Sequence, residues 1–230
     1  EPRTAELIET ARPMLRRVTG ERVRNEITLL LKEARPESAL LDLQMRGCLT
    51  AIHPAFTLHA DFAQHMSEAR ALGGQWLGQA FDLIELYWHV TLAAVAPHEI
   101  HEVCERLLMN QADARSITAM IGLWHQPHAL AQPNAKPSQI VTRLDGVSPV
   151  ALLAAWLITR DDRLVRYVSV WQHVRPKITG RDLKARRVPS GPGYKRILNR
   201  LRAAWLDGEI SDAAGESALL ESLLAAENTQ

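Results

Sequence analysis

The sequence has few of the features that mark secreted or membrane proteins. It contains only two cysteines, Cys48 and Cys104, which lie in apolar surroundings without a CxxC pattern. We expect two buried thiols in a reducing compartment, and therefore a cytoplasmic protein, because disulfides persist mainly in oxidising compartments. No signal-peptide pattern is present. Apolar runs such as residues 151–158 are far shorter than the roughly 18 residues that a membrane span requires.

Strict alternation of apolar and polar residues, which is typical of strands, is not sustained anywhere in the 230 residues. Helical periodicity predicts an all-α protein, with enough chain for one large or two small domains. Thr19 is expected to cap a helix over residues 20–34, and residues 150–159 read as a buried helix. Two helical patterns over residues 60–89 are separated by Gly73-Gly74. The other expected helices cover residues 37–46, 97–109, 112–124, 161–173 and 211–226, with a proline-rich loop at 126–138.

The sequence also lacks the common motifs of a self-sufficient active site. No Asp-x-Asp or Glu-x-Asp pair lies on a plausible strand, where two-metal phosphoryl transfer would place it. A phosphate-binding loop and a nucleophile elbow are missing too. The chain begins with Glu1 in a polar, helical stretch, from which we expect a piece of a longer protein.

Two groups of histidines have the residue types of a metal site but not its full pattern. The first group is His53, His59, Asp61 and His65. The second group is His98, His101 and Cys104. In the first group, spacings of six residues do not bring ligands together on one face of a helix. The second group has a helical spacing but lacks a further motif elsewhere that would complete a set of metal ligands. We therefore predict no metal site. Five of the six tryptophans lie in apolar contexts that predict core packing, and the function of Trp124 is left open.

Positive charge is concentrated in residues 175–206. This stretch holds ten Lys and Arg against one acid, Asp182, an excess of +9; because the whole chain is +1, the remainder carries −8. At its centre a Gly191-Pro192-Gly193 turn opens a helical pattern that runs to Trp205. Backbone N–H groups at such a turn, together with Lys and Arg, can hold phosphates. The stretch thus favours a sequence-tolerant nucleic-acid clamp. A solvated surface with glycine caps is the structural alternative.

Stretches near the two ends of the chain together resemble one known family. Residues 17–27, RVTGERVRNEI, are similar to the Ser/Thr-Gly-Glu-Arg-hydrophobic-x-x-Glu segment of bacterial tRNA nucleotidyltransferases and poly(A) polymerases, the CCA-adding enzyme family. Residues 36–54 resemble the continuation of the neck domain in that family. Residues 178–183, ITGRDL, and the Gly-Pro turn before a helix ending in Leu206-Asp207-Gly208 resemble its C-terminal module.

The resemblance implies an elongated all-α array without the catalytic head of these enzymes. Its parts would be a neck at residues 1–59, a body at 60–174 and a basic tail at 175–230. The implied function is tRNA 3′-end processing, in which body and tail hold the acceptor and T-arms of tRNA by backbone and shape. Mg²⁺ and ATP or CTP are expected at the absent head, with no cofactor and no catalytic residue in this part. The parent would be a nucleotidyltransferase, and this chain alone would be inactive.

The same resemblance implies particular site residues. Glu21, Arg22 and Glu26 would brace the nucleotide pocket, although Glu21 also fits the acid that a first helical turn favours. The expected RNA-binding residues are Arg181, Lys184, Arg186, Arg187, Gly191, Gly193, Lys195, Arg196 and Arg200. Two other functions stay open at this point. The basic face could dock an acidic protein partner, or the histidines could serve a metal-dependent hydrolase.

Overall fold

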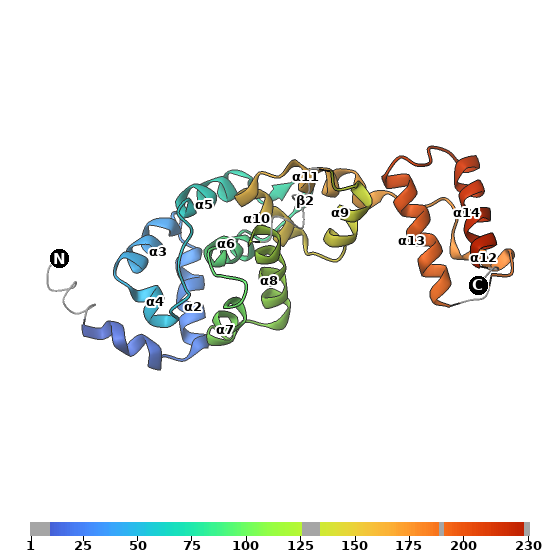
Figure 1. Ribbon diagram of the computed structural model, residues 1–230. Coiled ribbons are helices and arrows are strands. Elements are labelled where there is room, and N and C mark those ends of the chain that lie inside the picture. The colour runs from blue at the N-terminus through green and yellow to red at the C-terminus, as the bar shows by residue number, and fades with distance from the viewer. Residues whose placement is uncertain (1–9, 126–133, 189–190, 228–230) are drawn as a thin grey trace. The chain divides into compact units, whose positions relative to one another are not determined.

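The computed structural model describes residues 10–125, 134–188 and 191–227. In these residues the regular secondary structure is helical apart from one two-stranded hairpin, which confirms the all-α class (Figure 1; η marks a 3-10 helix). The first elements are η1 (Arg12–Arg17), α2 (Gly20–Leu31), α3 (Pro36–Met45), α4 (Cys48–Ile52), α5 (Phe62–Ala71), β1 (Gln75–Trp76), β2 (Gln79–Ala80), α6 (Leu83–Leu92), α7 (Ile100–Arg106) and α8 (Gln111–His125). The later elements are α9 (Pro137–Leu144), α10 (Pro149–Thr159), α11 (Asp162–Ser169), η3 (Trp171–His173), α12 (Gly180–Ala185), α13 (Pro192–Leu206) and α14 (Ala213–Glu227).

Contacts between these elements divide the chain into two compact units. The first is formed by Glu1–His128 and Gly146–Leu164, and the second by Ala129–Asp145 and Val165–Gln230. Helix α9 therefore packs with the C-terminal helices, although the chain returns to the first unit directly after it. The division into neck, body and tail at residues 59 and 174 stays a prediction. None of the helices described here is long and apolar enough to cross a membrane.

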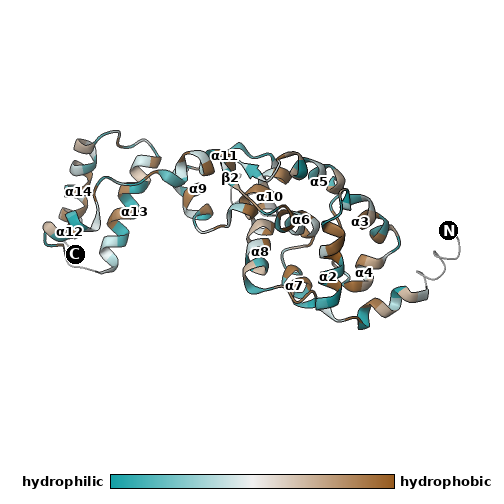
Figure 2. Cartoon of the chain, turned by 180° about the vertical axis from the view of Figure 1, so that it is seen from behind, coloured by the Kyte–Doolittle hydropathy of each residue, from teal (hydrophilic) through white to brown (hydrophobic). Residues whose placement is uncertain are grey.

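The core of the first unit surrounds α10, which is apolar on nearly every side. Ser148 caps this helix, because its Oγ accepts the N–H of Ala151 at 3.2 Å, and Pro149 occupies the first turn. Helix α10 packs against α5, α6 and α8 and is buried along most of its length, as predicted for residues 150–159. Figure 2 shows the matching segregation, with hydrophobic residues along the inner sides of the helices and hydrophilic ones outside.

A chain of hydrogen bonds that starts at the buried His89 and continues through the partly buried Ser116 and Ser148 joins α6, α8 and α10. His89, which is 0% exposed, has Nδ1 2.8 Å from the carbonyl oxygen of Glu85 and Nε2 2.7 Å from Oγ of Ser116. Ser116 Oγ lies 2.6 Å from Oγ of Ser148. A carbonyl can only accept, so Nδ1 carries the hydrogen and Nε2 accepts from Ser116. Burial lowers the pKa of His89 to about 4.

The Thr-Gly-Glu-Arg segment owes its glycine to a close approach between helices. Gly20 opens α2 and is buried, and a Cβ atom placed on it would lie 2.1 Å from the carbonyl oxygen of Arg106. The Arg106 guanidinium then ties three segments together by donating to the carbonyls of Leu15 and Val18 at 2.9 Å and of Ile52 at 3.2 Å. A side chain at position 20 would force these segments apart.

The structure differs from the sequence-based expectation in several places. Helix α9 was not predicted, the helix expected over residues 161–173 is divided into α11 and η3, and α7 is shorter than the expected 97–109. Between Gly73 and the start of α6 the chain forms a hairpin in which Gln75 pairs with Ala80 and Trp76 with Gln79. Strands of two residues are too short to show an alternating pattern, so periodicity could not reveal them. In addition, α2 ends at Leu31 instead of residue 34, and the side chain of Thr19 forms no capping hydrogen bond although the residue occupies the N-cap position.

Candidate nucleic-acid interface

Helix α12 begins at a turn that its own side chains close. The N–H and the Oγ1 hydroxyl of Thr179 both donate to Oδ2 of Asp182, at 2.7 Å each. These bonds hold the pKa of Asp182 below its usual range, with the Thr179 hydroxyl as the largest contribution. Leu183 is 0% exposed, whereas Arg181 and Lys184 are exposed. The ITGRDL motif therefore builds a capped helix with one buried anchor and two outward cations.

Helices α12, α13 and α14 share a small hydrophobic core of their own. Its fully buried members are Leu183, Ile197, Leu201 and Leu220. Partly buried side chains around it are Ile178, Val188, Tyr194, Leu198, Leu219, Leu223 and Leu224. The Tyr194 hydroxyl donates to the carbonyl of Val188 at 2.9 Å and so fastens the chain that leads from α12 to α13. This core gives the basic stretch a rigid support.

A buried carboxylate fixes the entry to α12. Glu216 of α14 is 1% exposed and accepts the backbone N–H groups of Lys177 at 3.2 Å and Ile178 at 3.1 Å. The ammonium group of Lys177 lies 5.4 Å from the ring centre of Trp205, within cation–π distance. Lys177 is thus engaged within the unit. Sequence reasoning missed Glu216, because an isolated glutamate in a helix carries no signal that it is buried.

Several cations of the basic stretch are paired with acids of the same unit. Arg186 forms an ion pair with Glu221 of α14. Arg200 pairs with Glu209 at 2.6 Å, and Glu209 also lies 3.5 Å from Nζ of Lys136. The Arg200 guanidinium holds the pKa of Glu209 below its usual range. Two predicted RNA-binding residues, Arg186 and Arg200, therefore have intramolecular partners that a phosphate would have to replace.

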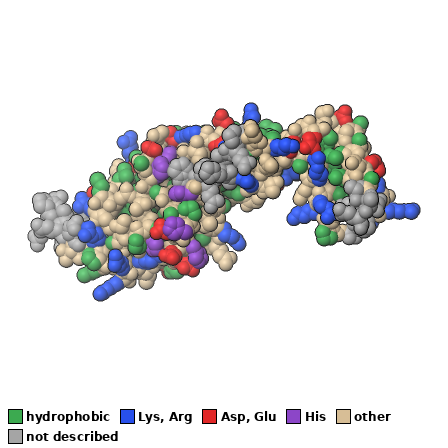
Figure 3. Space-filling view, viewed as in Figure 1, with side chains coloured by type: hydrophobic (Ala, Val, Ile, Leu, Met, Phe, Trp, Pro, Cys, Tyr) green, Lys and Arg blue, Asp and Glu red, His purple; other side chains and the backbone are tan. Residues whose placement is uncertain are grey.

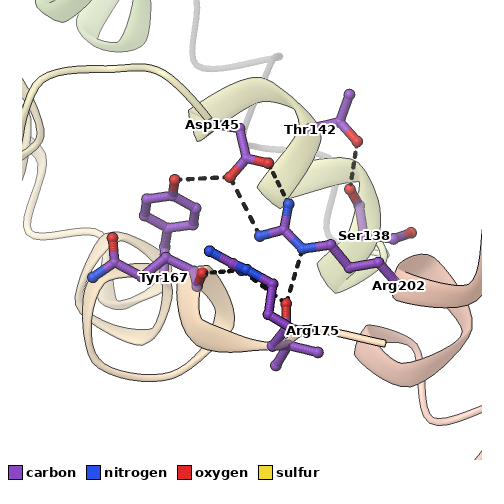
Figure 4. Close-up of polar contacts among 8 residues, drawn as sticks. Ser138, Thr142, Asp145, Tyr167, Arg175 and Arg202 are labelled. Atoms are coloured by element: carbon purple, nitrogen blue, oxygen red, sulfur yellow. Dashed lines mark hydrogen bonds and ion pairs between the residues drawn. The ribbon is translucent and has the colours of Figure 1, made fainter. Parts of the chain in front are cut away.

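Two other arginines of the stretch also form hydrogen bonds within the second unit. Arg202 donates to Asp145 and, from Nε, to the carbonyl of Val174 at 3.0 Å. Arg175 donates to the same Val174 carbonyl at 2.9 Å (Figure 4). Neither was among the predicted RNA-binding residues. Arg202 connects separate segments of the second unit, whereas Arg175 bonds to carbonyls of its own segment, Gln172 and Val174.

The remaining cations are directed to solvent. Among the described residues, no hydrogen bond or ion pair engages the side chains of Arg181, Lys184, Arg187 and Lys195, all of which are exposed. Arg196 is exposed on α13 and takes part in an interaction. Figure 3 shows Lys and Arg side chains projecting from the part of the second unit that carries these helices. The four cations lie on α12, on the first turns of α13 and at the chain between them.

The predicted glycines lie at the start of α13. Gly191 occupies the N-cap position, Pro192 begins the helix and Gly193 follows in its first turn. The N–H groups of a first helical turn have no partner within the helix, which makes this end favourable for an anion. The structure places both glycines beside Lys195 in sequence and space, within the same two turns.

The predicted braces of the nucleotide pocket lie on α2 in the first unit. Glu21, Arg22 and Glu26 are all exposed, and within the described residues no hydrogen bond or ion pair engages their side chains. Arg22 and Glu26 line a groove of about 610 Å³ between η1, α2, α3 and α4, whereas Glu21 does not. Its walls are mainly apolar, with Leu15 and Ile27 among them. Sequence reasoning did not anticipate this groove.

The two histidine groups do not come together as metal ligands. In the described part of the chain, no group of three His, Cys, Asp or Glu side chains could hold a metal ion. The rings of His59 and His65 lie 5.3 Å apart, and His65 Nδ1 is buried without a hydrogen-bond partner. Burial lowers the pKa of His65. Of the five tryptophans predicted to pack in the core, Trp76 and Trp88 are buried, whereas Trp156, Trp171 and Trp205 are only partly buried; the side chain of Trp124 is outside the described residues.

Comparison with known proteins gives the family. Residues 1–59 match the family model described as "Probable RNA and SrmB- binding site of polymerase A". The A-adding tRNA nucleotidyltransferase of Geobacter sulfurreducens is 30% identical over 222 residues, covering 90% of this chain and 25% of that protein. The chain belongs to the family of CCA- and A-adding tRNA nucleotidyltransferases. The matched range 1–59 is the range predicted for the neck.

Solved structures of this family share the fold. The Thermotoga maritima CCA-adding enzyme complexed with tRNA superposes with a TM-score of 0.70 at 19% identity, covering 97% of this chain and 56% of that one. A CCA-adding enzyme in complex with ATP gives a TM-score of 0.72 at 20% identity, covering 98% and 56%. The chain thus spans a quarter of its curated relative and about half of the solved chains. At this identity the likeness shows the fold alone.

Proposed function

We propose that this part of a tRNA nucleotidyltransferase binds the acceptor and T-arms of tRNA through α12, α13 and the chain between them, and so contributes to tRNA 3′-end processing. The observation that carries the proposal is a set of exposed cations that have no partner among the described residues and lie on, or between, helices with their own core: Arg181, Lys184, Arg187 and Lys195. Such cations release counterions from RNA without first breaking an ion pair. Membership of a tRNA-acting family supports the same assignment.

The neck has a separate place in this proposal. Arg22 and Glu26, four residues apart on α2, stand at the groove of the first unit, where they would brace a nucleotide pocket completed by other parts of the enzyme. Mg²⁺ and ATP or CTP belong to the head implied by the resemblance. In the described residues, no group of three candidate ligands could hold a metal ion.

The test compares two double variants of the full 230-residue chain that change the net charge equally. Arg181→Gln/Lys184→Gln removes two cations that have no partner among the described residues of the unmodified chain. Arg186→Gln/Arg200→Gln removes two cations that are ion-paired there. The binding of tRNA is measured by fluorescence anisotropy over a range of salt concentrations. The first variant should flatten the slope of log K against log salt by about 2, at roughly 0.9 per lost phosphate contact, and the second by clearly less.

Equal effects of the two variants would show that only net charge matters and would refute the assignment to particular cations. A tRNA lacking its T-arm tests the RNA region, because a clamp on that arm must lose affinity when the arm is removed. If heparin competes as well as folded tRNA, the basic face docks acidic polymers in general, as a protein-interaction module would.

A further inference from the structure

Helix α13 holds α9 at its N-terminal end through Asp207. The carboxylate accepts the backbone N–H of Ser138 at 2.9 Å and the Ser138 hydroxyl at 2.7 Å. Ser138 is the second residue of α9, so its N–H has no partner within the helix. Asp207 thus acts as an N-terminal cap supplied from a residue 69 positions away in the sequence. The aspartate of the Leu206-Asp207-Gly208 motif therefore has a structural partner in α9.

Helix α13 also holds the other end of α9, through Arg202. Its Nη1 donates to Oδ2 of Asp145 at 2.5 Å, and Asp145 is the residue that follows α9 (Figure 4). Nε of the same guanidinium donates to the carbonyl of Val174 at 3.0 Å. The Tyr167 hydroxyl donates to the second oxygen of Asp145 at 3.0 Å. One arginine therefore joins three segments of the second unit.

The contact at the N-terminal end complements the dipole of α9, because the Asp207 carboxylate lies where the helix carries partial positive charge. At the C-terminal end the Arg202 guanidinium neutralises Asp145, a carboxylate that would otherwise face the negative end of the helix. Because α9 has eight residues and is only about 12 Å long, contacts at both ends fix its direction as well as its position. The Arg202 side chain is only 19% exposed, so solvent screens this pair less than the exposed pairs of α13.

From this geometry we infer that Arg202 and Asp207 are positioning residues, which fix the RNA-binding helices relative to α9 and the segment before α12. The inference rests on the proposed function for its RNA part only. If the contacts of Arg202 and Asp207 with α9 and the segment before α12 are removed, α12, α13 and α14 keep their own core but lose their fixed orientation relative to α9. A short RNA that touches only these helices should then bind normally, whereas a folded tRNA that also contacts other parts of the chain should not.

The first test measures orientation without RNA. Spin labels are placed at Thr142→Cys on α9 and Ser222→Cys on α14, both exposed, while Cys48 and Cys104 are buried. The Thr142 hydroxyl donates to the carbonyl of Ser138 at 2.8 Å, not to the N–H or hydroxyl that Asp207 binds. The distance distribution between the labels should broaden in Arg202→Gln and Asp207→Ala. It should stay narrow in Asp207→Asn, because an amide oxygen still accepts the N–H of Ser138. An unchanged distribution in the first two variants would overturn the inference.

The second test compares full tRNA with an RNA duplex of about one helical turn, using the full chain. Arg202→Gln should lower tRNA affinity about tenfold, change duplex affinity less than about twofold and leave the salt slope unchanged. The control Lys195→Gln also removes one positive charge, but at a residue without a partner among the described residues. It should lower the affinity for both RNAs and flatten the salt dependence of binding. A flattened slope in Arg202→Gln would make Arg202 a phosphate contact and refute positioning. If the distance distributions broaden in the variants while the unmodified chain binds no tRNA, the proposed function is refuted but the positioning role of Arg202 and Asp207 is supported.

Discussion

Mild acid should destabilise the first unit through His89, a residue that is not part of the proposed interface. Its folded-state pKa of about 4 lies below the ordinary 6.5, because burial of the ring disfavours its charged form. Below pH 6.5 the unfolded chain binds a proton that the folded chain resists. Stability is therefore fully present above pH 6.5 and is lost as the pH falls toward 4.

The size of the loss follows from the two pKa values. One titrating group with these values removes about 2 kcal/mol by pH 5 and about 3 kcal/mol by pH 4, at up to 1.36 kcal/mol per pH unit. Protonation would also make Nε2 a donor, so the hydroxyls of Ser116 and Ser148 would have to reverse their direction. This second cost also lowers the stability at acid pH, and the contacts among α6, α8 and α10 that these hydrogen bonds join would weaken together.

The assay is urea unfolding from pH 7.5 to 4 of the unmodified chain and of His89→Gln, whose amide does not titrate. The variant should be less stable at pH 7.5, and the gap between the two proteins should shrink by about 2 kcal/mol at pH 5. Other acid-sensitive groups, including the buried His65, contribute equally to both proteins and cancel. Parallel loss of stability in the two proteins would refute the argument.

Three further substitutions have defined outcomes. Gly20→Ala should cost at least about 2 kcal/mol in thermal unfolding because of the 2.1 Å approach to a carbonyl, whereas Gly122→Ala, with open space around it, should be neutral or stabilise by up to about 1 kcal/mol. Glu216→Gln should cost about 1–3 kcal/mol, since a buried amide donor would replace an oxygen that accepts a backbone N–H. Glu221→Gln frees Arg186 and should tighten tRNA binding up to about threefold at low salt, with little change in stability.

Local patterns predicted most of the helices, since their causes are local, but not α9, which follows a proline-rich stretch. The buried helix over residues 150–159 and the turn that opens α13 follow from residues within a few positions of each other. The ITGRDL motif likewise closes its own turn through Thr179 and Asp182. The hairpin at Gln75–Ala80 was missed because two-residue strands give no periodic signal, and its stability depends on Trp76 being buried against the unit.

Contacts between distant residues could not be predicted in this way. The requirement for glycine at position 20 comes from a carbonyl 86 residues later, at Arg106. Asp207 looks like a helix-terminal residue in the sequence, yet it caps a helix that begins 70 residues earlier. The apolar groove beside Arg22 depends on four elements that meet only in the folded unit. In each case the missing information is which segments touch, and a single sequence does not contain it.

The basic stretch shows why charge alone overestimates an RNA-binding surface. Its excess of +9 counts every cation equally, but the unit supplies acids from outside the stretch that neutralise Arg186, Arg200 and Arg202. Arg202 and Lys177 organise the unit, and four exposed cations remain without partners among the described residues. Some cations of this stretch stabilise the fold of the unit, and others are available to contact a phosphate backbone. One cation does not serve both roles at once, because a cation bound within the protein releases no counterions from RNA. The salt dependence of tRNA binding should therefore reflect the free cations, and not the ten that the sequence contains.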